Sequence, residues 1–153
     1  MSDKEDKKFF NPIILPYRIL PSTLEPTIWP LVIVKVPKFK DPLNQDIYAL
    51  IDSGASNSIL DKQIVLRMGV DLNKCKKYKN GRSVSDTYGF WVLEEPIYVK
   101  IGIIEFPVIF NVIDSDKTMW SMILGEDSIF KFAKIVFNKN KKEFEIIFRR
   151  DIN

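Results

Sequence analysis

The chain has 153 residues, 46% of them apolar, and a net charge of +3 from 23 basic and 20 acidic side chains. This size suits one globular domain, and the small basic excess does not by itself indicate a nucleic-acid-binding surface. The chain has no histidine and one cysteine, Cys75, which excludes Ser-His-Asp and Cys-His catalysis, zinc sites with histidine ligands and an internal disulfide. Any enzymatic acid–base chemistry therefore falls to carboxylates, lysine or tyrosine.

Residues 1–26 are predicted to form an N-terminal arm, charged over residues 1–8 and rich in proline after that. The start lacks the apolar stretch of a signal peptide, and no apolar run reaches the roughly 18 residues of a membrane helix, so we expect a cytoplasmic protein without a membrane partner. Five of the nine prolines lie between Pro12 and Pro30. Because proline fixes φ and lacks an N–H donor, this segment should be extended. Its apolar residues predict that it lies against its own domain, a second subunit or another partner.

The remaining sequence predicts a mainly β domain over residues 27–150. Short runs of β-branched and aromatic residues, separated by turn residues, are typical of strands. Strands are expected at residues 27–36, 46–51, 57–60 and 122–125, and hairpins at residues 74–90, 97–113 and 134–148. Gly102 marks the turn of the second hairpin. Pro107 on its return strand predicts an edge or a bulge, because proline cannot donate to a ladder.

Two short helices are expected among these strands. The first covers residues 61–68, with Asp61 as the N-cap and Gly69 just beyond the end of the helix, where glycine is favoured. The second covers residues 127–132 and begins near Asp127. Many short strands with one or two small helices predict a closed or nearly closed β architecture.

The segment around Asp52 carries the candidate chemistry. An apolar strand end over residues 49–51 leads into Asp52-Ser53-Gly54-Ala55. An acid at a buried strand end is desolvated, and its ionisation depends on its neighbours. For these residues alone, an ordinary turn in which Asp52 accepts from the following backbone amides is the more frequent explanation.

A second element lies about 70 residues further along the chain. Ile123-Leu124-Gly125 is a short apolar strand that ends in glycine, and Asp127 follows two residues later. The two elements, in this order and at this distance, resemble the retropepsin-like aspartic proteases. That family carries an apolar-apolar-Asp-Thr/Ser-Gly-Ala loop and a later apolar-apolar-Gly element. The resemblance covers residues 27–148 and is greater to the retroviral and DNA-damage-inducible-protein-like branches than to pepsin.

The resemblance implies a retropepsin-like closed β-barrel that works as a two-fold homodimer, because this chain has one Asp-Ser-Gly-Ala loop where pepsin-like chains have two. Each subunit would supply Asp52 as the catalytic residue, and the two carboxylates, about 3 Å apart, would share one proton. The charged carboxylate would activate water and the protonated one would polarise the peptide carbonyl, with no metal or cofactor. Ser53 would bind across the interface, Gly54 would let the loops approach, and Gly125 would pack behind the loop. The supporting active-site residues would be Ser53, Gly54, Ala55, Ile123, Leu124 and Gly125.

Peptide substrates are expected to bind extended, between this site and a flap. The flap is placed at the tip of the first hairpin, which departs from the Gly-x-Gly tip common in the family. The candidate flap residues that bind substrate are Gly81, Arg82, Ser83, Val84 and Ser85. Phe90, Trp91 and Ile123 are candidates for lining the substrate pockets, and ordinary core packing explains each of them equally well.

Two other functions stay open. The same fold could be catalytically silent and serve as a dimerisation or peptide-binding module. A small β-barrel could instead bind nucleic acid through the basic residues of 74–82, with Tyr78 or Trp91 as stacking platforms. Because short basic runs are usually solvated loops and the Asp52 loop is intact, we expect an aspartic endopeptidase that acts on a peptide or protein substrate and binds no nucleic acid.

Overall fold

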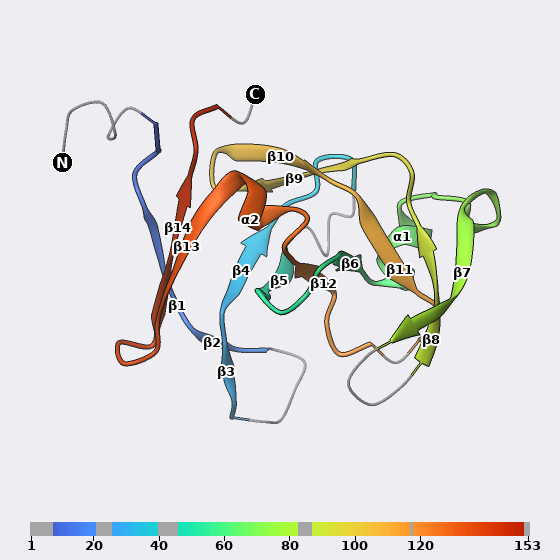
Figure 1. Cartoon of the computed structure of the whole chain (residues 1–153), viewed down its shortest axis with the longest axis horizontal. Helices are drawn as coiled ribbons and strands as arrows, with labels where there is room; N and C mark the ends of the chain where they lie inside the picture. The colour runs from blue at the N-terminus through green and yellow to red at the C-terminus, as the bar shows by residue number, and fades with distance from the viewer. Residues whose placement is uncertain (1–7, 21–25, 40–45, 83–86, 117, 152–153) are drawn as a thin grey trace.

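The computed structural model describes residues 8–20, 26–39, 46–82, 87–116 and 118–151. The fold is mainly β, as predicted, and the elements follow one another along the chain as drawn in Figure 1. The strands are β1 (Ile13–Pro16), β2 (Arg18–Ile19), β3 (Ile28–Trp29), β4 (Leu31–Val34), β5 (Ile47–Ile51), β6 (Ser58–Leu60), β7 (Lys76–Arg82), β8 (Thr87–Val92), β9 (Ile97–Ile101), β10 (Ile104–Val108), β11 (Phe110–Ile113), β12 (Met122–Leu124), β13 (Ala133–Asn138) and β14 (Glu143–Phe148). The helices are α1 (Lys62–Arg67), the short 3-10 helix η1 (Leu72–Lys74) and α2 (Ile129–Phe132).

The largest sheet has seven strands in the order β4-β5-β12-β6-β11-β8-β7. The pairs β5–β12 and β6–β11 are parallel, and the other neighbours are antiparallel. The expected closed barrel is wrong, because β4 and β7 are the two edges of this sheet within the described residues. Lysines at positions 76, 77 and 79 lie along β7, and lysine on an edge strand discourages further pairing.

Pro30 explains a second difference from the expected elements. We predicted one strand over residues 27–36, but the structure has β3 and β4 on either side of Pro30. Proline has no N–H to donate to a ladder, and here its carbonyl accepts from Ile51 at 3.0 Å. As a result β3 pairs with β2, and β4 pairs with β5 in the large sheet.

The N-terminal segment lies against the chain's own C-terminal hairpin. Strand β1 pairs antiparallel with β14, which also pairs with β13, so the three form a separate sheet at one side of the molecule (Figure 1). Strand β1 is an edge strand, as expected for a strand that contains Pro16. The sequence left open whether this segment lies against its own domain, a second subunit or another partner. Residues 13–16 lie against the chain's own domain. The division between arm and domain at residue 27 stays a prediction.

The predicted hairpin over residues 97–113 is confirmed in its first part. Strands β9 and β10 pair around a turn at Gly102, whose φ is +59°. Pro107 lies on β10, which has no second neighbour among the described strands and is therefore an edge, as expected. The return strand does not continue to residue 113, because β11 leaves the hairpin and lies between β6 and β8 in the large sheet.

The first helix follows its sequence signals more closely than the second. Asp61 caps α1 by accepting from the Gln63 N–H, and Gly69 has a φ of +79° after the last turn. Helix α2 begins at Ile129, two residues later than expected; Ser128 is its N-cap residue, and the Asp127 carboxylate accepts from the Ser58 hydroxyl. No helix in the described part of the chain is long and apolar enough to span a bilayer.

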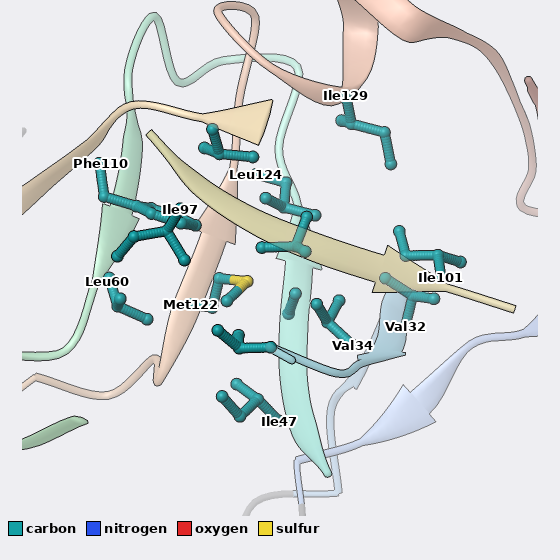
Figure 2. Close-up of a cluster of buried hydrophobic side chains, with 14 of the residues drawn as sticks. Val32, Val34, Ile47, Leu60, Ile97, Ile101, Phe110, Met122, Leu124 and Ile129 are labelled. Carbon is teal, nitrogen blue, oxygen red and sulfur yellow. The ribbon is translucent and has the colours of Figure 1, made fainter. Parts of the chain in front are cut away.

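One large cluster of buried apolar side chains forms the core. It collects residues from the large sheet, from the β9–β10 hairpin and from β14. Figure 2 shows how Val34, Met122 and Leu124 from the large sheet meet Ile97 and Ile101 of β9 in this cluster. Burial of these side chains fixes which face of each strand points into the core. Because side chains alternate along a strand, it also fixes the face to which the side chains at the strand ends point.

Candidate functional site

Asp52 is the first residue beyond β5, at a point where the sheet hydrogen bonding continues. Its backbone N–H donates to the carbonyl of Leu124 at 3.0 Å, so Asp52 extends the ladder between β5 and β12. Its carboxylate Oδ1 accepts from the Gly54 N–H at 2.9 Å, and the residue is half-buried. The site thus has a fixed backbone and a carboxylate within reach of solvent.

The hydrogen bond from Gly54 does not by itself distinguish Asp52 from a turn residue. Asp61 and Asp71 accept in the same way from the N–H two residues further on, at 2.6 and 3.0 Å. These two aspartates begin helices on the surface. Asp52 differs from them in its place, because it follows a central strand of the large sheet and borders a groove.

The two sequence elements of the predicted site lie side by side. Strands β5 and β12 are parallel neighbours, with Leu50 opposite Ile123 and Ile51 opposite Leu124. Gly125 then passes so close to the Asp52 loop that an added Cβ would overlap the carbonyl oxygen of Ala55. The next N–H, of Glu126, donates to that same oxygen at 2.8 Å. The position of Gly125 behind the loop therefore requires glycine.

Ser58 links these elements, and the sequence reasoning missed it. Its hydroxyl donates to the Asp127 carboxylate at 2.7 Å, accepts from the Gly125 N–H at 3.0 Å and lies 2.6 Å from the hydroxyl of Ser128. Both serines are fully buried. The available signal was a serine two residues before Leu60, at an inward-facing position of a predicted strand, where an apolar residue is usual.

Replacing Ser58 with alanine is expected to destabilise the fold by about 2–3 kcal/mol, because the buried N–H of Gly125 and the Asp127 carboxylate lose a partner. Chemical denaturation measures this change in the free energy of unfolding. Ser56→Ala, at an exposed position of the same loop, is the matched control and should leave stability within about 0.5 kcal/mol of the wild type. Equal unfolding curves for the two variants would contradict the role given to Ser58.

The register of the large sheet separates two faces. Residues directly paired across strands point to the same face. One row, which includes Val32, Ala49, Met122, Leu60 and Phe110, is buried in the core. The other row follows the pairings through Leu31, Leu50, Ile123, Ile59, Asn111 and Val92.

This second row defines what we call the outer face of the sheet. At one end Leu31 and Leu50 are buried beneath a smaller cluster that includes Leu20 and the edge-to-face pair Trp29–Trp120. From Ile123 to β8 the outer face is partly exposed and mostly apolar. Because side chains alternate along an extended strand and Asp52 follows Leu50 by two residues, Asp52 lies at this face.

The register also sorts the residues that we expected to line substrate pockets. Ile123 is part of the outer face, and so is Phe90, which stacks on Tyr78 with ring centroids 5.3 Å apart. Trp91 alternates with Phe90 and packs against the core instead. Gly81 and Arg82 lie at the end of β7, whereas the remaining predicted flap residues, Ser83, Val84 and Ser85, lie outside the described residues.

A groove of about 440 Å³ borders Asp52 and Ser53. Its walls are largely apolar and include Trp29, Pro30 and Phe137, with Lys139 at the rim. Phe137 is 39% exposed, a large fraction for a phenylalanine. The groove thus joins the candidate carboxylate to an incompletely covered apolar surface at the end of β13.

The other chemically reactive groups do not form a competing centre among the described residues. Burial, together with Glu94 and Asp71, raises the pKa of the Cys75 thiol, so this cysteine is not an activated thiolate. No group of three or more cysteine, aspartate or glutamate side chains in the described part of the chain is arranged to hold a metal ion.

Comparison with solved structures identifies the fold. The chain matches a retropepsin-like aspartic protease from Rickettsia conorii with a TM-score of 0.59 and 20% sequence identity, over 91% of this chain and 92% of that one. It matches the retroviral protease-like domain of Ddi1 from Leishmania major with a TM-score of 0.50 and 20% identity, over 82% of this chain and 96% of that one. No family model matches the chain, and no curated protein matches it in sequence. The retropepsin-like fold predicted from the sequence is confirmed, apart from the closed barrel.

Proposed function

We propose that this chain is one subunit of a homodimeric aspartic endopeptidase in which each subunit contributes Asp52. The observation that carries the proposal is the position of Asp52. It continues the β5–β12 ladder, Gly54 fixes one of its carboxylate oxygens, and it borders both the outer face of the sheet and the apolar groove. The retropepsin-like fold supports this assignment, because one matched structure is a retropepsin-like aspartic protease and another is a retroviral protease-like domain.

A pair of carboxylates gives the site its chemistry. Two Asp52 side chains held about 3 Å apart at a two-fold axis would share a single proton, because like charges at that distance disfavour double ionisation. The ionised carboxylate takes a proton from a bound water, which attacks the peptide carbon while the protonated carboxylate donates to the carbonyl oxygen. The carboxyl group that took the water proton then gives it to the leaving amine as the C–N bond breaks, while a hydroxyl of the tetrahedral diol returns its proton to the other carboxylate, so that the shared-proton state is restored.

The outer face of the sheet is suited to an extended peptide. The face is mostly apolar and partly exposed from Ile123 to Phe90, and it begins beside Asp52. A peptide lying along this face, which Phe90 of the β7–β8 hairpin helps to form, would place its backbone along the strands and its apolar side chains on the sheet. We therefore expect cleavage between apolar residues.

The test is an assay combined with a mass measurement. The purified chain is incubated with an unstructured protein at several values between about pH 3 and 7, because a coupled carboxylate pair predicts a bell-shaped rate profile, and new amino termini are counted. Sedimentation equilibrium gives the mass at the same concentrations. Cleavage that rises with the dimer fraction is expected. A chain that stays monomeric at high concentration, or that forms the dimer and cleaves nothing, contradicts the proposal.

Phe137→Asp is expected to weaken the dimer about a hundredfold, because it places a charge in the groove beside Asp52, where an apolar anchor would otherwise be buried by the second subunit. Cleavage at low concentration should fall in parallel and recover as the concentration is raised. Tyr98→Asp is the control, since Tyr98 is 52% exposed and lies on β9, outside the groove. If Phe137→Asp and Tyr98→Asp have the same dissociation constant, the groove is not the dimer contact.

A further inference from the structure

One carboxylate joins three elements at the base of the β7–β8 hairpin. Asp114 follows β11, and its Oδ2 accepts from the Lys77 ammonium of β7 at 2.6 Å. Its Oδ1 accepts from the Lys62 ammonium of α1 at 3.2 Å. Its backbone N–H donates to the carbonyl of Gly89 in β8 at 2.8 Å. Both strands of the hairpin and helix α1 are therefore tied to the same residue.

The two lysines also share an aromatic ring. The Lys77 and Lys62 ammonium nitrogens lie 4.6 and 5.5 Å from the centre of the Trp91 ring. Trp91 packs against the core and belongs to β8. Two cations over one ring repel each other, and the Asp114 carboxylate between them offsets that repulsion. We call these four residues the Asp114 cluster.

The cluster differs from an ordinary surface ion pair in its burial and its connections. The side-chain exposure is 23% for Lys62, 33% for Asp114 and 41% for Lys77, whereas in the pair Lys35–Asp46 it is 62% and 56%. Isolated exposed pairs contribute little to stability, but networks with partly desolvated cation–π contacts contribute more. Loss of Asp114 would leave two ammonium groups facing each other over Trp91.

We propose that Asp114 is a positioning residue that holds the base of the β7–β8 hairpin against α1 and so fixes the part of the outer face that the hairpin forms. This inference rests on the proposed function, because a peptide is taken to lie along that face. The geometry fits the role, since Trp91 and Lys77 fasten one face of the hairpin, while Phe90 and Tyr78 stack on each other on the opposite face, where Tyr78 is exposed.

The cluster remains charged in mild acid. The hydrogen bonds from Lys77, and then from Lys62, lower the pKa of Asp114 below its ordinary value. A carboxylate with a lowered pKa contributes stability at pH values above its ordinary pKa, and that stability is lost only as the pH falls through the lower, folded-state value. The charged groups that face Asp114 are Lys62 from α1 and Lys77 from β7, while β8 presents the uncharged Trp91 and the Gly89 carbonyl. The hairpin base therefore stays fastened where a shared-proton carboxylate pair works.

Hydrogen–deuterium exchange tests the cluster without any activity. In Asp114→Asn, backbone amides of residues 76–82 and 87–92 should exchange about fivefold faster than in the wild type, while those of β13 and β14 stay unchanged. Asp46→Asn, which removes the exposed pair with Lys35, is the control and should alter neither region. Unchanged exchange of the hairpin in folded Asp114→Asn overturns the proposal, whatever the chain cleaves.

Kinetics then test the positioning role. Asp114→Asn should raise KM for a peptide about fivefold and leave kcat within about twofold, because substrate and transition state lose the same contact with the hairpin. Asp114→Glu should restore most of the loss by keeping the charge. Faster exchange with an unchanged KM contradicts the positioning role.

If Asp114→Asn does not fold, Lys77→Met is measured in its place, with the same expectations and the same overturning results. A wild type that cleaves nothing refutes the endopeptidase, and the exchange experiment still decides whether Asp114 holds the hairpin.

Discussion

Asp52→Asn is expected to lower kcat/KM for peptide cleavage by at least about a thousandfold and to leave the fold and the dimer unchanged. Asparagine has nearly the same shape as aspartate. Its side-chain oxygen can still accept the hydrogen bond from the Gly54 N–H, which is 2.9 Å long in the wild type. It cannot take a proton from water or donate an acidic proton to a carbonyl, and such transfers contribute about a hundred- to ten-thousandfold. Circular dichroism and sedimentation confirm the intact dimer before activity is compared.

Asp71→Asn is the matched control for this variant. Asp71 is exposed and accepts from the Asn73 N–H at 3.0 Å, so it has the same local hydrogen bond as Asp52 without the neighbouring groove. Its replacement should leave kcat/KM within about twofold. Equal activity of wild type and Asp52→Asn would mean that Asp52 is a turn residue, and the silent binding module would then be the better description of the fold.

Mixed subunits separate a shared site from two independent ones. When equal amounts of wild type and Asp52→Asn exchange subunits at random, about one quarter of the dimers contain two aspartates. If cleavage needs both carboxylates, activity falls to about a quarter of that of an equal total amount of wild type. If each subunit works alone, half of the activity remains. The measurement needs no knowledge of the natural substrate.

The sequence could predict the features that depend on neighbouring residues. Asp61 and Gly69 bound α1 as expected, because N-caps and left-handed glycines act within one or two residues. The apolar strand end before Asp52 placed this carboxylate at the end of β5 for the same reason. The pairing of β5 with β12 is non-local, and resemblance to a family, rather than periodicity, predicted that the two elements meet.

Other features depend on the register between strands far apart in sequence. Phe90 and Trp91 look alike as candidates for a pocket, yet they lie on opposite faces of β8, and only the pairing with β11 tells which face is buried. The Ser58 hydrogen bonds and the Asp114 cluster are side-chain contacts between distant elements. No local pattern encodes them, because each partner alone is an ordinary serine, aspartate or lysine.

Gly125→Ala is expected to destabilise the fold by about 3 kcal/mol, and to lower the melting temperature by about 6–12 °C. The added Cβ would overlap the Ala55 carbonyl oxygen and lie 3.0 Å from that of Asn57. Both obstacles are backbone atoms, so no side-chain rotation can relieve them, and the loop over residues 52–57 or the β12 end must move. Movement of either breaks the Glu126–Ala55 hydrogen bond.

Gly69→Ala separates this steric effect from the general cost of replacing glycine. Gly69 has a φ of +79° and nothing within 4 Å of an added Cβ, so its replacement should cost about 1 kcal/mol through backbone conformation alone.

The two variants should also differ in their effect on activity. In the proposed dimer, a displaced loop would move Asp52 away from its symmetry mate, so any folded Gly125→Ala should cleave poorly, whereas Gly69→Ala should retain wild-type kcat. Similar melting temperatures and similar kcat values for both variants would show that the loop tolerates a side chain behind it, and that the close approach at Gly125 does not hold Asp52 in place.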